Sequence, residues 1–114
     1  MKQFFPAPDR GDDVWITLAL QAGRKQQARR PAVVLSPQAY NSRVGLAVLC
    51  PITSRVKGYP FEVLLPPDLP VEGAILSDQV ESLDWREHRA ERVCSLPPAI
   101  VDEVLGKLRV LLES

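Results

Sequence analysis

Short apolar runs separated by turn residues dominate the first two thirds of the chain. These runs are rich in Val, Ile, Leu and aromatic residues, which favour extended backbone, and they have the lengths of strands. Pro37 and Pro51 each follow one run directly, and a proline-rich cluster separates the last two. The pattern predicts a loop over residues 21–30 and five strands, at residues 13–20, 31–36, 44–50, 59–65 and 71–77.

The order of these runs favours a small antiparallel barrel. No helical pattern separates the predicted strands, which is typical of a closed or half-closed barrel rather than of βαβ units. The last segment changes period, because its apolar residues recur every three or four positions. They are Ile100, Val101, Val104, Leu105, Leu108, Leu111 and Leu112. We therefore expect a mainly β fold with one C-terminal amphipathic helix, whose apolar stripe covers an open end of the barrel.

Size and composition indicate one neutral domain that spans residues 1–114. The chain has 14 basic and 14 acidic side chains, and no repeat or linker divides it. No apolar run approaches the roughly 18 residues that a membrane crossing requires, and the N-terminus lacks a signal-peptide stretch. We therefore expect a cytoplasmic protein that does not bind membranes. Cys50 and Cys94 are expected to be reduced, half-buried thiols.

Zero net charge conceals an uneven distribution of charge. Residues 14–61 contain no Asp or Glu but seven basic residues, which are Arg24, Lys25, Arg29, Arg30, Arg43, Arg55 and Lys57. The rest of the chain carries seven basic and fourteen acidic residues, a net charge of −7. A cationic face suits a polyanion such as nucleic acid, because each contacted phosphate releases condensed counterions. A solvated face without a partner is the alternative.

Common metal and hydrolase motifs are missing from the sequence. A structural zinc site needs four closely spaced Cys or His ligands, whereas the chain has two distant cysteines and a single histidine, His88. His88 lies in a strongly charged stretch, where we interpret it as a solvated side chain rather than the partner of a nucleophile. The phosphate-cradling pattern GxxxxGK(S/T) is absent as well. We expect neither a metal nor a cofactor.

Two short segments carry groups suited to binding a phosphate. Arg29 and Arg30 directly precede Pro31, whose fixed backbone would hold at least one guanidinium on a rigid element. The segment after the third predicted strand carries two hydroxyls and two cations, at Thr53, Ser54, Arg55 and Lys57. A surface ion pair for the arginines and an ordinary turn for the second segment are equally good interpretations of the same residues.

Five blocks of residues occur in a fixed order between about residues 9 and 90. They read RGDDVWI, QAG, RRPAVVLSPQAYN, CPITSRVKGYPFEV and SDQVESLDWR. Together they resemble the PemK/MazF family of bacterial toxin endoribonucleases. The resemblance implies an SH3-like barrel with a C-terminal helix, and a homodimer. It also implies the toxin of a type II toxin–antitoxin system, which cleaves single-stranded mRNA at short sequences without metal and so inhibits translation and growth. A MazE-like antitoxin with an acidic tail would neutralise it.

The resemblance also assigns roles to individual residues. The family's catalytic arginine matches Arg30, and its catalytic threonine matches Thr53. Relatives usually carry a glutamate in the first loop, where this chain has Lys25. The residues expected to contact RNA are Arg24, Arg29, Ser54, Arg55, Lys57, Asp78 and Gln79.

Cleavage of RNA by its own 2′-hydroxyl needs a proton acceptor, positive charge beside the phosphorane, and a proton donor for the leaving 5′-oxygen. Arg30 suits the second task best, because a guanidinium stays charged and donates hydrogen bonds to phosphate, and donation to the leaving 5′-oxygen is within its reach. Thr53 would orient the phosphate. Lys25 is the candidate proton acceptor, because three neighbouring arginines disfavour its charged form.

Two other functions fit the same sequence. The first is a relative that binds RNA but cuts it weakly or not at all, since Lys25 replaces the usual glutamate. The second is a gyrase poison like the CcdB group, which shares the fold but is disfavoured by the RRP and PITS blocks. Tyr59, Phe61 and Trp85 are candidates either for stacking on bases or for positions in the core.

Overall fold

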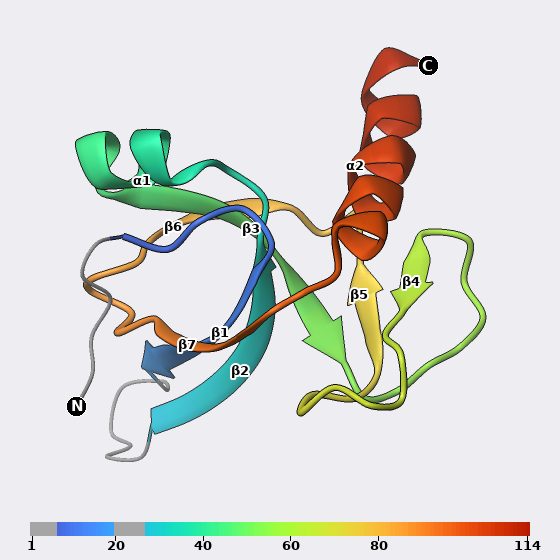
Figure 1. Ribbon diagram of the computed structural model, residues 1–114, viewed down its shortest axis with the longest axis horizontal. Helices are drawn as coiled ribbons and strands as arrows, with labels where there is room; N and C mark the ends of the chain where they lie inside the picture. The colour runs from blue at the N-terminus through green and yellow to red at the C-terminus, as the bar shows by residue number, and fades with distance from the viewer. Residues whose placement is uncertain (1–6, 20–26) are drawn as a thin grey trace.

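Figure 1 shows the fold in a computed structural model, which describes residues 7–19 and 27–114. Seven strands and two helices lie in these two ranges. They are β1 (Asp12–Ala19), β2 (Gln27–Val34), α1 (Gln38–Val44), β3 (Leu46–Thr53), β4 (Glu62–Leu64), β5 (Ala74–Leu76), β6 (Glu81–Asp84), β7 (Glu91–Ser95) and α2 (Pro98–Glu113).

The strands form one curved antiparallel sheet. Its order is β4-β5-β3-β2-β1-β7, and β6 pairs with β3 off this path. β3 is central, because one of its edges pairs with β2 while the other pairs first with β6 and then with β5. The predicted fold, a mainly β barrel with a C-terminal helix, is confirmed by this architecture.

One predicted boundary is wrong because β3 runs through Pro51 instead of ending before it. Residues 46–49 of β3 pair with β6, and residues 52–53 pair with β5. The N–H of Leu35 donates to the carbonyl of Val48, so by alternation the nitrogen of Pro51 points to the edge shared by β6 and β5. Pro51 therefore falls in the gap between two partners, where the N–H that proline lacks is not needed.

A second predicted boundary is wrong at the start of β2. Residues 27–30 were expected to belong to a loop, but β2 begins at Gln27. These four residues are strand because they pair with residues 16–19 of β1. Arg29 and Arg30 consequently lie within a strand rather than just before one.

The hydrophobic pattern also missed three short elements. α1 has seven residues, of which only Asn41 is buried, so it carries no apolar stripe. β6 and β7 are mostly exposed or half-buried and show no clean alternation of apolar residues. In contrast, the predicted strands at residues 59–65 and 71–77 shorten to the three-residue strands β4 and β5, because only their centres are paired.

The curved sheet has a hydrophobic core on each of its faces. Successive side chains of a strand point to opposite faces, so Val33 of β2 enters one core while Val34 enters the other. The first core packs α2 over β3, β4 and β5, with Ile75 and Val104 fully buried. The second core is closed by Trp85, which is 5% exposed. The candidate catalytic strands β2 and β3 are thus held between two packed layers.

α2 takes part in the core as far as Leu108, which packs against it, but its last turn does not. Val101 and Val104 are buried, whereas Leu111 and Leu112 are exposed. Figure 1 shows the C-terminal end of α2 projecting away from the sheet. The predicted apolar stripe is therefore confirmed as a cover for the sheet over the first turns of the helix. Neither helix in the described ranges is long and apolar enough to cross a membrane.

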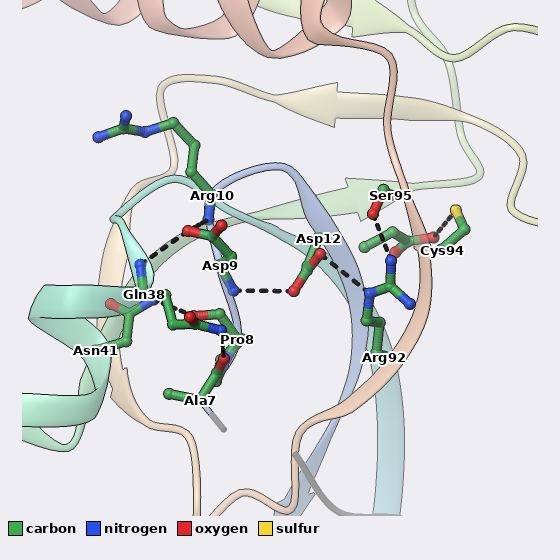
Figure 2. Close-up of polar contacts among 11 residues, drawn as sticks. Ala7, Pro8, Asp9, Arg10, Asp12, Gln38, Asn41, Arg92, Cys94 and Ser95 are labelled. Carbon is green, nitrogen blue, oxygen red and sulfur yellow. Dashed lines mark hydrogen bonds and ion pairs between the residues drawn. The ribbon is translucent and has the colours of Figure 1, made fainter. Parts of the chain in front are cut away.

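A polar network joins the segment before β1 to α1 and to β7 (Figure 2). The buried amide of Asn41 donates to the carbonyl of Pro8 at 2.8 Å, and the carboxylate of Asp9 accepts the N–H that opens α1 at 2.8 Å. Asp12 accepts the N–H of Asp9 at 2.9 Å and forms an ion pair with Arg92 at 3.2 Å. These bonds fix the start of β1, which in turn sets the register of β2.

Asp13 is a fully buried acid beside this network. Its Oδ2 accepts a weak hydrogen bond from the Cys94 thiol at 3.8 Å, while its Oδ1 has no hydrogen-bond partner among the described residues. Burial raises the pKa of Asp13 from 3.8 to about 6. Both cysteines are free thiols: Cys94 is half-buried, as predicted, but Cys50 is fully buried. Burial, with a smaller contribution from Asp78, raises the pKa of Cys50 to about 12.

Replacing Asp13 by Asn is expected to stabilise the protein in a pH-dependent way. The native carboxyl holds its proton more tightly than the unfolded one, so the wild type loses stability as pH rises from about 4 to 6. Asp13→Asn removes this loss and should raise the free energy of unfolding at pH 8 by up to about 3 kcal/mol, with little gain at pH 4. Urea denaturation at the two pH values measures both effects.

The neighbouring substitution Asp12→Asn serves as the control for this prediction. Asp12 has an ion pair with Arg92 and a hydrogen bond from the backbone of Asp9. Its replacement should therefore lower the stability at pH 8, opposite in sign to Asp13→Asn. An equal gain for Asp13→Asn at pH 4 and pH 8 would contradict a titrating carboxyl.

Candidate nucleic-acid interface

The two candidate catalytic residues lie on neighbouring strands, Arg30 near the middle of β2 and Thr53 at the end of β3. The last recorded pair between β2 and β3 joins Ala32 to Pro51. Continuing this register by two residues places Arg30 opposite Thr53, where β3 pairs with β5 on its other edge. Arg30 is exposed, and its guanidinium forms no recorded hydrogen bond or ion pair within the described ranges. The sheet therefore presents a free cation beside a hydroxyl.

Thr53 is held by close contacts of its backbone and by its hydroxyl. The residue is half-buried and pairs with Ala74 of β5. Its Oγ1 accepts the N–H of Arg55 at 3.1 Å, which turns the chain as it leaves β3. Gly73 has a φ of 122°, and a Cβ at this glycine would stand 2.0 Å from the carbonyl oxygen of Thr53. Only glycine allows the two backbones to approach this closely.

The loop between β3 and β4 is tied to the body of the protein at several points. Glu62, the first residue of β4, accepts hydrogen bonds from three consecutive backbone N–H groups, those of residues 57–59. The hydroxyl of Tyr59 donates to Asp78, and Nζ of Lys107 on α2 donates to the carbonyl of Pro60 at 2.8 Å. Sequence reasoning missed Glu62. Its only signal is that it is the first acid after the acid-free residues 14–61.

Two predicted RNA contacts, Asp78 and Gln79, follow β5 and lie beside this loop. Asp78 is half-buried and Gln79 is exposed. One carboxylate oxygen of Asp78 accepts the Tyr59 hydroxyl, and this bond is the main cause that raises the pKa of Tyr59. The other oxygen, Oδ1, is buried and unpartnered among the described residues, as is the hydroxyl of Ser77. The hydrogen bond from Tyr59 thus joins Asp78 to the loop that follows Thr53.

Arg29 does not join this group. Its side chain forms an ion pair with Glu91 of β7 at 2.7 Å and lies over the ring of Trp15, 5.0 Å from the ring centre. Alternation along β2 places Arg29 on the face opposite to Arg30. The interpretation as a surface ion pair therefore holds for Arg29. The side chains of Arg29 and Glu91 are 50% and 51% exposed.

The remaining candidates divide between exposed positions and positions outside the described residues. Ser54, Arg55 and Lys57 are exposed on the loop that follows Thr53. The predicted catalytic Lys25 and the predicted RNA contact Arg24 lie in residues 20–26, which the structure does not describe.

The structure decides between the two interpretations of Trp85 and corrects the interpretation of His88. Trp85 is a core residue, and its indole N–H donates to the carbonyl of Asn41 at 2.9 Å, so it is unavailable for stacking on a base. Tyr59 is exposed and lies 6.0 Å from the ring of Phe61. His88 is half-buried rather than simply solvated, because its ring nitrogen Nδ1 hydrogen bonds with the carbonyl of Thr17 at 2.9 Å. No three His, Cys, Asp or Glu side chains gather as a metal site requires within residues 7–19 and 27–114.

The fold and the candidate site together define a small β-sheet protein with a C-terminal helix and with an exposed cation and a hydroxyl on two neighbouring strands. A model of the family described as PemK-like, MazF-like toxin of type II toxin–antitoxin system matches residues 9–112. The chain therefore belongs to this family, and the membership expected from the sequence blocks is confirmed.

Individual relatives agree with this assignment. The endoribonuclease toxin MazF of Escherichia coli K12 is 39% identical over 105 residues, which are 92% of this chain and 94% of the relative. The endoribonuclease PemK of Escherichia coli is 30% identical over 109 residues, which are 91% of this chain and 81% of the relative. The crystal structure of a MazE–MazF complex from Deinococcus radiodurans contains a chain that is 53% identical, with a TM-score of 0.90 over 94% of this chain and 96% of that one.

The contact between Gly73 and Thr53 predicts a large effect of a single methyl group. In Gly73→Ala the new Cβ would overlap the Thr53 carbonyl, and the positive φ adds strain, so the free energy of unfolding should fall by at least about 2 kcal/mol. Gly106→Ala in α2 is the matched control, because a Cβ there meets nothing within 4 Å. It should stabilise the helix by about 0.5–1 kcal/mol. Denaturation curves give the change in the free energy of unfolding for each variant. If this change had the same sign in both variants, the close approach of the Gly73 and Thr53 backbones would be contradicted.

Proposed function

We propose that the protein is the toxin of a type II toxin–antitoxin system and acts as a metal-independent, sequence-specific endoribonuclease on single-stranded RNA. Cutting mRNA would inhibit translation and growth. Family membership over residues 9–112 and the names of the Escherichia coli relatives support this activity. The observation that carries the proposal is the exposed position of Arg30, a cation with no recorded partner among the described residues, which falls opposite Thr53 when the register of β2 and β3 is continued by two residues.

The reaction follows from the groups at this edge. The 2′-oxygen of the RNA attacks the adjacent phosphorus, the bond from phosphorus to the 5′-oxygen breaks, and the products carry a 2′,3′-cyclic phosphate and a 5′-hydroxyl. Arg30 stabilises the charge that develops on the phosphorane and donates a proton to the leaving 5′-oxygen, which becomes the 5′-hydroxyl. Thr53 orients the phosphate, and Lys25 accepts the proton of the 2′-hydroxyl.

The residues around this edge bind the RNA on either side of the cleaved bond. Cations of the β3–β4 loop contact phosphates, and the exposed ring of Tyr59 offers a stacking surface for a base. The proposed contacts are Arg24, Ser54, Arg55, Lys57, Asp78 and Gln79. Arg29 is left out of this set because it is paired with Glu91 on the other face.

The proposed partners are a MazE-like antitoxin and a second copy of the chain, in the cytoplasm. A MazF from Deinococcus radiodurans that is 53% identical to this chain has been crystallised with MazE, which supports an antitoxin of that kind. Exposed apolar side chains support the homodimer, because a two-fold contact would remove them from water. They are Leu64, Val110, Leu111 and Leu112.

Adjacent arginines provide a sharp test of the proposed activity. Incubation of the wild type with a long single-stranded RNA in EDTA should produce discrete fragments with 5′-hydroxyl ends. Arg30→Ala should reduce cleavage by at least about 10²-fold, as expected for loss of a group that stabilises the transition state. Arg29→Ala removes the same charge one residue away and should keep most of the activity, because Arg29 is held by Glu91. Equal losses in the two variants would contradict the assignment of Arg30.

Substitutions of Lys25 test whether this residue accepts the proton or limits the activity, and the wild type itself tests whether the protein cuts RNA at all. Lys25→Ala should lower cleavage if the lysine accepts the proton, and unchanged cleavage would remove Lys25 from the mechanism. Faster cutting by Lys25→Glu would show that the lysine limits activity. If the wild type binds RNA in a salt-dependent way but does not cut it, the protein is a binding relative instead.

A further inference from the structure

The carboxylate of Glu62 gathers a run of backbone N–H groups from the preceding loop. The N–H of Lys57 lies 3.2 and 3.1 Å from the two carboxylate oxygens, and the N–H groups of Gly58 and Tyr59 lie 2.9 and 3.3 Å from Oε1. The N–H of Glu62 donates in return to the carbonyl of Tyr59 at 3.0 Å. Consecutive N–H groups that converge in this way form an anion-binding concavity. Here the anion is a side chain of the same protein.

This concavity determines the path of the loop over residues 54–61, which leaves β3 directly after Thr53 and returns at β4 (Figure 1). Gly58 has a φ of 78°, the left-handed conformation that turns its N–H toward Glu62. The loop carries the exposed cations Arg55 and Lys57, and it contains no helix or strand of its own. The carboxylate of Glu62 therefore accepts more of the recorded hydrogen bonds of this loop than any other group.

An acid at this position needs an explanation, because it stands on the face that we propose for a polyanion. A carboxylate beside bound RNA repels phosphate and weakens binding. The carboxylate of Glu62 nevertheless accepts hydrogen bonds from backbone N–H groups and forms no recorded ion pair with Arg55 or Lys57. Its contribution to the site is therefore the conformation of the loop.

We propose that Glu62 is a positioning residue for RNA binding, which holds the β3–β4 loop so that Arg55 and Lys57 stand in a fixed relation to Thr53. The inference rests on the proposed RNA cleavage. Because the loop carries no reacting group, its displacement changes KM for RNA and leaves kcat nearly unaltered.

The direction in which KM for RNA changes in Glu62→Gln distinguishes a positioning role of Glu62 from simple repulsion of phosphate. Glu62→Gln keeps the shape of the side chain but removes the charge that strengthens the three N–H bonds. Loss of an acid on its own should leave RNA binding unchanged or tighten it, whereas loss of loop order should raise KM by about tenfold. Glu72→Gln is the matched control, because Glu72 is exposed and makes no recorded side-chain hydrogen bond with the described residues. Its KM should stay the same or fall.

Amide hydrogen exchange provides a second readout that does not depend on RNA. The amides of Lys57, Gly58 and Tyr59 should lose protection in Glu62→Gln and keep it in Glu72→Gln. If Glu62→Gln fails to fold, Gly58→Ala strains the same run of N–H groups without a change of charge and should also raise KM. An unchanged KM in folded Glu62→Gln, with an active wild type, would overturn the inference and leave the proposed function standing. A wild type that neither binds nor cuts RNA would overturn both.

Discussion

Strand β3 is shared between two parts of the sheet, and the rest of the structure depends on how it changes partners. Along one edge it stays with β2, while along the other it leaves β6 at Leu49 and joins β5 at Ile52. A slip of one residue in this register would turn Cys50 and Ile52 away from the core under α2. The same register sets Thr53 against Ala74 and Gly73, so the packing of the core and the placement of the candidate site are consequences of one constraint.

Electrostatics at the candidate site differ from what the linear sequence suggests. The segment free of acids is not a uniformly cationic face once it has folded. Glu91 neutralises Arg29, and Glu62 caps the backbone of the loop that holds Arg55 and Lys57. Arg30, Arg55 and Lys57 form no recorded ion pair within the described residues, and the two loop cations follow Thr53 directly in the chain. Pairing therefore removes Arg29 from the charge that is available to a phosphate, but leaves these three cations.

Much of the fold could be predicted because its main elements have clear periods. The three- and four-residue spacing predicted α2, and the apolar runs located the centres of β1, β3, β4 and β5 but only the second half of β2. The missed elements lacked such signals: α1 buries only Asn41, and β7 is held by pairing with β1 rather than by its own apolar residues. The candidate residues Arg30 and Thr53 came from their resemblance to family blocks. Glu62 was not found, because its role depends on hydrogen bonds to backbone groups.

The sequence by itself determined the mainly β class, the C-terminal helix and the toxin family, because these depend on local periodicity and on blocks of residues in order. Only the tertiary structure decided that Pro51 lies inside a strand, that Arg29 and Arg30 have separate surroundings, and that Asp13 is a buried acid. Each of these outcomes depends on the neighbours of a residue in the folded sheet: the strand edge that its backbone faces, the side chains that it contacts, and its access to solvent. Such contacts join residues far apart in the chain, so no local pattern of residues records them.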